Sequence, residues 1–346
     1  MANKTARLGD LATYINGYAF KPADWGDTGL PIIRIQDLTG NSYQLNRYDG
    51  EYPERIEVND GDVLISWSAS LGVYVWQRGK ALLNQHIFKV VFDKLPINKD
   101  YFVFAVEHKL AEMESKTHGA TMKHIVKKDF DGTTIPYPTS EKQVEIADHL
   151  RRITSIIDRQ TEQLLLLDQL VKSRFIELFG DPETNPKGWT RQRLDQICEN
   201  LDSRRVPITS TNRKAGNYPY YGASGIVDYV KDYIFDEDIL LISEDGANLV
   251  MRSTPIAFSV SGKVWVNNHA HVVRFESKAT QKYIEICFAL TDISGSITGT
   301  AQPKLNQAKL NAMMFCVPPI ELQEQFATFV EQTDKSKLCG KMEVAA

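Results

Sequence analysis

The spacing of apolar residues in the first 140 residues changes from that of strands to that of a helix. Residues 56–68 contain a turn at Asn59-Asp60-Gly61 followed by an apolar run typical of a buried strand, and residues 86–92 alternate like a second strand. Residues 100–116 have helical apolar spacing, with Asp100 positioned as a cap. The pattern predicts an α+β module of about 130 residues.

The second half of the chain repeats this order, with strands predicted near residues 239–243 and 271–275 and a helix near 281–290. A period this long indicates a duplicated domain, because solenoid repeats span only about 20–45 residues. The strings that recur in the same order are RLGDL from Arg7 and RLDQI from Arg193, GDVLIS from Gly61 and EDILLIS from Glu237, GKALLNQHIFKVVF from Gly79 and GKVWVNNHAHVVRF from Gly262, and GATMKHIVKKDF from Gly119 and GTAQPKLNQAKL from Gly299.

Residues 139–180, between the modules, have the pattern of a long coiled-coil helix. Ser140 is a suitable N-cap, and Gly180 with the prolines after it ends the helix. At about 1.5 Å per residue, about 40 residues form a rod of roughly 60 Å. The three-and-four spacing predicts a seam that pairs with another helix, although burial within one domain is the alternative. The seam residues are Ile146, Leu150, Ile153, Ile157, Leu164, Leu167, Val171 and Leu178.

Composition limits the class of protein. The charged fraction of 24% is that of a globular chain, and no apolar run of the length of a membrane span occurs. The N-terminus has no apolar secretion signal, and the four cysteines are far apart without metal-ligand spacing. We therefore expect a cytoplasmic protein without a metal, cofactor or membrane partner. The net charge of -4 argues mildly against a free-standing nucleic-acid binder, so the distribution of charge decides.

Basic residues gather at the same place in both repeats. Residues 116–128 hold four lysines, two histidines and no acid, and residues 293–320 hold no acid. Lysines can bind phosphates, and amides can pair with base edges, so DNA contact is one interpretation; a solvated loop is the other. The candidate DNA-binding residues here are Lys116, Lys123, His124, Lys127, Lys128, Gln302, Lys304, Asn306 and Gln307.

Two further segments are weaker candidates for DNA contact. Ser66 and Ser68, in a loop expected after a strand, can offer hydroxyls to phosphates, although Trp67 between them is better explained by core packing. Arg204 and Arg205 resemble an exposed basic loop, with ordinary surface charge as the alternative. The tyrosines of residues 218–221 suit core and turn positions better than base stacking.

The histidines His86 and His269 recur at the same place in the two repeats, but no paired carboxylate, Ser or Cys recurs with them, so we do not assign them to catalysis. The chain also lacks a phosphate loop, a methyl-donor motif and an amino-methyltransferase string. No catalytic residue is therefore predicted.

With these features the chain resembles the specificity (S) subunit of type I restriction-modification systems. The resemblance covers nearly the whole chain and is carried by INGYAFKP from Ile15, FGDPETNPKGW from Phe179, YPYYGASGIVDYV from Tyr218 and PPIELQEQFATFVEQTDKSK from Pro318. It implies target recognition domains at residues 1–138 and 181–318, a central spacer helix at 139–180, and a partial second spacer helix with a tail at 319–346. Each recognition domain would bind one half of a split site in double-stranded DNA. The spacer helices would dock methyltransferase (M) subunits, and a restriction (R) subunit would join the complex.

The chain departs from the family pattern at its C-terminal end, where the second spacer is short. We expect the distal half of the seam, residues 164–178, to lack an intrachain partner, so that M subunits cover it, two chains pair through it, or assembly is impaired. Two other functions stay open: a single-chain nuclease or methyltransferase with the same recognition domains, and a coiled-coil interaction scaffold.

Overall fold

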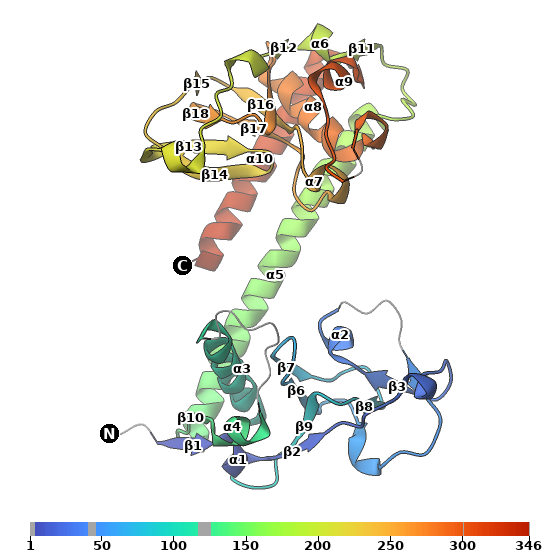
Figure 1. The fold of residues 1–346 in the computed structure, drawn as a ribbon, viewed down its shortest axis with the longest axis vertical. Helices are drawn as coiled ribbons and strands as arrows, with labels where there is room; N and C mark the ends of the chain where they lie inside the picture. Colours follow the sequence, from blue (N-terminus) through green and yellow to red (C-terminus); the bar gives the residue numbers. More distant parts are fainter. Residues whose placement is uncertain (1–3, 41–45, 117–125, 300, 346) are drawn as a thin grey trace. The chain divides into compact units, whose positions relative to one another are not determined.

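The computed structural model describes residues 4–40, 46–116, 126–299 and 301–345. Contacts divide the chain into two compact units, residues 1–156 (unit 1) and 157–346 (unit 2), with helix α5 (Ser140–Phe179) contributing to both. Figure 1 shows α5 as one uninterrupted helix. Within the described ranges, no helix is both long and apolar enough to cross a membrane.

The described residues of unit 1 form two four-stranded sheets and a two-stranded ribbon. Its strands are β1 (Thr5–Arg7), β2 (Thr13–Asn16), β3 (Leu30–Ile33), β4 (Arg47–Tyr48), β5 (Glu57–Val58), β6 (Val63–Ser66), β7 (Gly72–Val75), β8 (Ala81–Leu83), β9 (Ile87–Val91) and β10 (Thr134–Pro136). Its helices before α5 are α1 (Leu8–Leu11), α2 (Ile35–Leu38), α3 (Lys99–Lys116) and α4 (Lys127–Gly132), with short 3-10 turns at Pro22–Asp24 and Glu54–Ile56. One sheet has the order β2-β9-β6-β7, the other has the order β4-β3-β8-β5, and β1 pairs with β10.

Unit 2 repeats this topology. Its strands are β11 (Arg191–Arg193), β12 (Glu199–Asn200), β13 (Ala215–Gly222), β14 (Gly225–Val230), β15 (Phe235–Asp236), β16 (Ile239–Ser243), β17 (Ala257–Val260), β18 (Lys263–Val266), β19 (Ala270–Arg274) and β20 (Met314–Cys316). Its helices are α6 (Leu194–Ile197), α7 (Asn248–Met251), α8 (Lys278–Leu290), α9 (Gln307–Ala312) and α10 (Ile320–Ala345), with 3-10 turns at Asp202–Arg204, Ser210–Asn212 and Ser294–Ser296. The sheets have the orders β12-β19-β16-β17 and β14-β13-β18-β15, and β11 pairs with β20. The predicted duplicated α+β fold with a long spacer helix is confirmed.

The central strands explain why this topology forms in both units. Every residue of β6 and of β16 is buried, so each strand lies in the middle of its sheet with apolar residues on both faces. One face packs on the long helix that follows the sheet, α3 in unit 1 and α8 in unit 2, through Phe102 and Ile284 among others. The other face packs on the second sheet.

Helix α10 packs against the end of α5 within unit 2. The Phe326 ring lies edge-on to Phe175 and Phe179, with centroids 5.5 Å apart in both pairs. Farther along α10, Lys337 Nζ lies 2.7 Å from the Asp168 carboxylate, so the two helices run antiparallel. The expectation that residues 164–178 lack an intrachain partner is therefore wrong. Since α10 begins beside the C-terminal end of α5 and runs antiparallel to it, α10 packs on the distal part of the seam.

The exposed apolar residues of the seam lie earlier in α5. Leu150, Ile153 and Ile157 are 36%, 52% and 41% exposed, whereas Val171 in the distal half is 5% exposed. Ile146, Leu164, Leu167 and Leu178 have intermediate exposure. The seam is thus covered toward its C-terminal end and open in its middle.

Candidate nucleic-acid interface

In unit 2, the segment before α9 is held by backbone hydrogen bonds. The amides of Thr298 and Lys304 each donate to the other residue's carbonyl over 2.8 Å. The Leu305 amide donates to the Glu244 carbonyl over 2.8 Å, and the Gly246 amide donates to that of Pro303 over 3.0 Å. Residues 301–306 of the predicted basic segment therefore form a loop that is fastened to the residues that follow β16 and that directly precedes α9.

Three candidate residues lie in this loop and the fourth, Gln307, is the first residue of α9, and their side chains have different partners. Lys304 is half-exposed and its Nζ lies 3.1 Å from Glu244 Oε1. The Asn306 side-chain oxygen caps α9 by accepting from the Lys309 amide over 2.9 Å, which fits the preference of Asn for this position. Gln307 donates to Asn200 over 2.8 Å. Gln302 is exposed, as are Lys304 and Gln307.

The two arginines of the predicted basic loop have different surroundings. Arg204 is exposed, and its guanidinium donates to Glu237 over 2.7 Å. Arg205 has only 13% of its side chain exposed and donates to Glu244 over 2.6 Å, and its Nη2 lies 3.4 Å from the Asp202 carboxylate. The interpretation of Arg205 as exposed is wrong, because the carboxylates of Asp202, three residues earlier, and of Glu244, after β16, enclose it.

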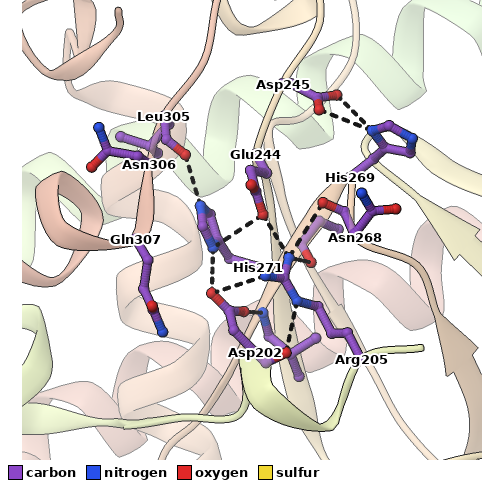
Figure 2. Close-up of polar contacts among 12 residues, drawn as sticks. Asp202, Arg205, Glu244, Asp245, Asn268, His269, His271, Leu305, Asn306 and Gln307 are labelled. Atoms are coloured by element: carbon purple, nitrogen blue, oxygen red, sulfur yellow. Dashed lines mark hydrogen bonds and ion pairs between the residues drawn. The ribbon is translucent and has the colours of Figure 1, made fainter. Parts of the chain in front are cut away.

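Beneath this loop lies a buried charged network, shown in Figure 2. His271 is fully buried in β19; its Nδ1 lies 2.6 Å from Asp202 Oδ2 and its Nε2 lies 2.8 Å from the Leu305 carbonyl oxygen. Glu244 Oε2 is 3.7 Å from the same Nδ1. We define the ionic network as Asp202, Arg205, Glu244, His271 and Lys304.

Both carboxylates of the ionic network are held in the charged form. Burial acts to raise the pKa of Asp202, but the hydrogen bond and positive charge of His271 outweigh it and the pKa lies below its ordinary value. Burial also acts to raise the pKa of Glu244, but hydrogen bonds from Arg205 and Lys304 outweigh it, and the pKa lies below its ordinary value. The Leu305 carbonyl can only accept a hydrogen bond, so His271 Nε2 is the donor in that contact.

His269 is exposed beside this network. Its Nδ1 lies 2.9 Å from Asp245 Oδ2, with half of its side chain exposed. The equivalent of Asp245 in unit 1 is Ser68, so the carboxylate partner does not recur with His86. In unit 1, His86 has φ 72° and lies edge-on to Trp67 with centroids 5.0 Å apart. The decision not to assign the two histidines to catalysis stays a prediction.

In unit 1, the serine candidates are placed differently from the expectation. Ser66 is the last residue of β6, is fully buried, and donates to the Ser68 carbonyl over 3.3 Å. Its hydroxyl is thus not displayed on the surface as expected, because the strand runs one residue farther. Ser68 is partly exposed. Trp67 packs on Phe88 with stacked rings 5.5 Å apart, in agreement with its interpretation as a core residue.

The lysine candidates of unit 1 are described only in part. Lys127 and Lys128 are exposed in the first turn of α4, and Lys127 Nζ lies 5.6 Å from the Tyr14 ring and 5.4 Å from the Phe88 ring. Lys116 ends α3. Lys123 and His124 lie outside the described residues.

The sequence interpretation missed Asp202, Glu244, Asp245 and His271. Their signal is weak but present: a histidine within the buried strand AHVVR (Ala270–Arg274), and carboxylates directly after short strands. A buried polar ring needs hydrogen-bond partners, so a histidine in this strand indicated polar partners from elsewhere in the fold. Which carboxylate supplies it depends on the fold, because Asp202 is 69 residues away in the chain.

Comparisons with known proteins agree with the fold. The family model described as "Type I restriction modification DNA specificity domain" matches residues 2–167 and 186–340. The EcoBI specificity subunit of a type I restriction enzyme from Escherichia coli is 29% identical over 168 residues, which is 48% of this chain and 35% of that protein. This alignment thus spans about a third of that relative. The MjaVIII specificity subunit of Methanocaldococcus jannaschii is 23% identical over 96% of this chain and 86% of its own.

Among solved structures, an S subunit of a type I restriction-modification system from M. genitalium superposes with a TM-score of 0.61. The match covers 99% of this chain and 92% of that chain at 15% sequence identity, and so shows a shared fold.

Proposed function

This chain belongs to the type I restriction-modification DNA specificity domain family, and from that premise we propose that its two units bind the two halves of a bipartite site in double-stranded DNA. The observation that carries the proposal is the duplication of one fold with a lysine-containing segment at the equivalent place in the sequence of both units. In unit 2 this segment precedes α9, and in unit 1 the matching sequence precedes α4.

The chemistry of the unit 2 segment supports contact with DNA. Lys304 is exposed on a loop that backbone hydrogen bonds hold, which suits a phosphate contact, and Gln307 is exposed as the first residue of α9, which suits a base-edge contact. A fixed loop loses little conformational freedom when it binds, so its side chains are pre-organised. In unit 1, Lys127 and Lys128 at the start of α4 would take the phosphate role.

We assign methyltransferase docking to the open part of α5. Leu150, Ile153 and Ile157 are exposed there, together with Leu165 and Leu166 at 60% and 55%. Large apolar side chains at such spacing are typical of a surface that another helix covers. The chain would recognise the sequence, and M and R subunits would supply methylation, translocation and cleavage.

A binding-site selection tests this function. Random duplex DNA is incubated with the purified chain, alone and with a co-expressed M subunit, and the bound fraction is sequenced. We expect two short enriched motifs at a constant separation. Enrichment of no motif under either condition would contradict the proposal and favour an interaction scaffold, and DNA product formed by the chain alone with Mg²⁺ and a methyl donor would favour a single-chain enzyme.

The phosphate contacts have their own prediction. Lys123→Ala and Lys304→Ala should each weaken binding to all sequences about equally and reduce the slope of log affinity against log salt by about one. The matched control is Lys278→Ala, since Lys278 is exposed, pairs with Asp238 and lies on α8 outside the loop. Fluorescence anisotropy over a salt series measures the slope, and an unchanged slope in the two variants would remove these contacts from the interface.

A further inference from the structure

The ionic network joins the DNA-facing loop of unit 2 to the centre of its sheet. His271 lies in β19, which pairs with β12 on one side and β16 on the other. From this central strand its Nε2 donates to the Leu305 carbonyl oxygen over 2.8 Å, which places the bond directly between Lys304 and Asn306. The loop thus has a side-chain attachment to the core in addition to its backbone bonds.

The two carboxylates of the network are each contacted by more than one nitrogen. Asp202 and Glu244 both face the His271 ring and the Arg205 guanidinium. Lys304 Nζ bonds to the second oxygen of Glu244 and remains half-exposed, so its positive charge is left toward solvent. Figure 2 shows His271 between Asp202 and Leu305, with Glu244 beside it.

The network also restricts where Lys304 can point. Glu244 Oε2 is occupied by Arg205 and Glu244 Oε1 by Lys304, so the carboxylate is fixed from both ends. Asp202 accepts from the Val272 amide over 2.8 Å as well as from His271, which fixes its orientation in turn. Charge-assisted bonds of this kind are short and directional, and they hold side chains more firmly than apolar contacts do.

We infer that His271 is a positioning residue for DNA recognition by unit 2, which fixes the segment Lys304 to Gln307 through the Leu305 carbonyl and sets the sequence preference of one half-site. His271 itself is fully buried and touches no DNA. Unit 1 has Phe88 at the equivalent strand position, so its half-site does not depend on such a bond. This inference rests on the proposed function.

The variant that tests it is His271→Phe, which copies unit 1 and keeps an aromatic ring of similar size. In it the Leu305 carbonyl loses its donor and the loop its attachment. The double variant Asp202→Asn with His271→Phe copies both equivalent residues of unit 1, Asn16 and Phe88, and leaves no unpaired Asp202 carboxylate. The double variant tests the same loop attachment if the single variant does not fold. The control is Val264→Ala, a truncation in the other core cluster of unit 2, away from the loop.

The full-length variants enter the selection with random duplex DNA, together with thermal unfolding and hydrogen exchange of residues 301–310. His271→Phe or the double variant should lose about tenfold or more enrichment at one motif, keep the other motif, and exchange the loop amides faster, whereas Val264→Ala should keep both motifs. Retention of both motifs, or an equal loss of both, would overturn the positioning role. If the wild-type chain enriches no motif, the proposed function itself fails, and that result is distinct from the other two.

Discussion

The two units use one topology to bury different chemistry at equivalent positions. The Trp67 amide donates to the His86 carbonyl in unit 1, and the Glu244 amide donates to the His269 carbonyl in unit 2, which sets the register between them. In that register Phe88 corresponds to His271. Unit 1 fills this region with the rings of Tyr14, Trp67, Phe88 and Phe130, and unit 2 fills it with the ionic network.

Because the two units share a topology but differ in these central side chains, the topology depends on features that both units have. Strand pairing and the apolar faces of β6, β9, β16 and β19 are common to both units. Aromatic packing needs only approximate geometry, and each pair contributes about 0.5–1.5 kcal/mol beyond its burial. An ionic network is directional and becomes costly when one member is lost. We therefore expect unit 1 to tolerate substitutions among its central aromatic residues. In unit 2 we expect the ionic network to fix the orientation of its member side chains.

The largest effect should come from breaking the network at one member. Asp202→Ala leaves His271 and Arg205 buried without this carboxylate, and we expect the free energy of unfolding of unit 2 to fall by about 3–5 kcal/mol. The double variant Asp202→Asn with His271→Phe should recover most of this loss, because it replaces both residues by their equivalents in unit 1 and leaves no buried histidine without its Asp202 partner. Urea denaturation gives the values, and a double variant as unstable as Asp202→Ala would show that the units are not interchangeable at these positions.

The second-largest effect should come from acidification. It should destabilise unit 2 less than Asp202→Ala does, because protonation removes only the charge of a carboxylate. The folded-state pKa values of Asp202 and Glu244 lie below their ordinary values of 3.8 and 4.5. Groups with a depressed pKa contribute stability above their ordinary values, and this is lost as the pH falls through the folded values. Hydrogen exchange as a function of pH should therefore show unit 2 opening below about pH 4 before the aromatic centre of unit 1. Equal loss in both units would contradict the comparison.

The smallest predicted difference concerns two equivalent glutamines at the starts of α5 and α10. Gln143 accepts from the Asn98 amide over 2.9 Å and donates to the Pro138 carbonyl over 3.0 Å. Gln323 donates to the Pro318 carbonyl over 2.7 Å, and its Oε1 has no partner among the described residues. Gln143→Ala should lower the free energy of unfolding by about 1–3 kcal/mol. Gln323→Ala should lower it by about 1 kcal/mol less, since fewer buried groups lose partners in that variant. Thermal unfolding of the two variants compares them directly, and an equal cost would contradict this ranking.

The fold was largely predictable because repeated strings report repeated elements. GKALLNQHIFKVVF and GKVWVNNHAHVVRF each cover a pair of strands, and residues 139–180 cover α5 at Ser140–Phe179. The pairing of α10 with the distal part of α5 was not predicted, since helix spacing alone does not say at which end a partner begins. Spacing identified Ile153 as a seam residue, and it is 52% exposed, so its pairing with another helix stays a prediction; the part of the seam expected to be open was the wrong one.

The candidate site was less predictable, because it joins four segments that are far apart in the chain. Lys304 and Gln307 were recognised from local composition. Asp202, Glu244 and His271 each resemble ordinary strand or turn residues when considered alone, and only the pairing of β19 with β12 and β16 brings them together. Arg205 was misjudged in part for the same reason: Asp202 lies only three residues before it, but its other carboxylate partner, Glu244, is 39 residues away in the chain.

The spread of the ionic network over four segments also constrains how unit 2 can change by genetic exchange. A crossover between residues 205 and 271 would separate Asp202 and Arg205 from His271 and strand buried charge unless the incoming sequence carried the same partners. A crossover in the open middle of α5 would transfer the network whole. The aromatic centre of unit 1 has no comparable linkage of opposite charges among its described residues, so fragments of unit 1 should be exchanged between relatives more freely than fragments of unit 2.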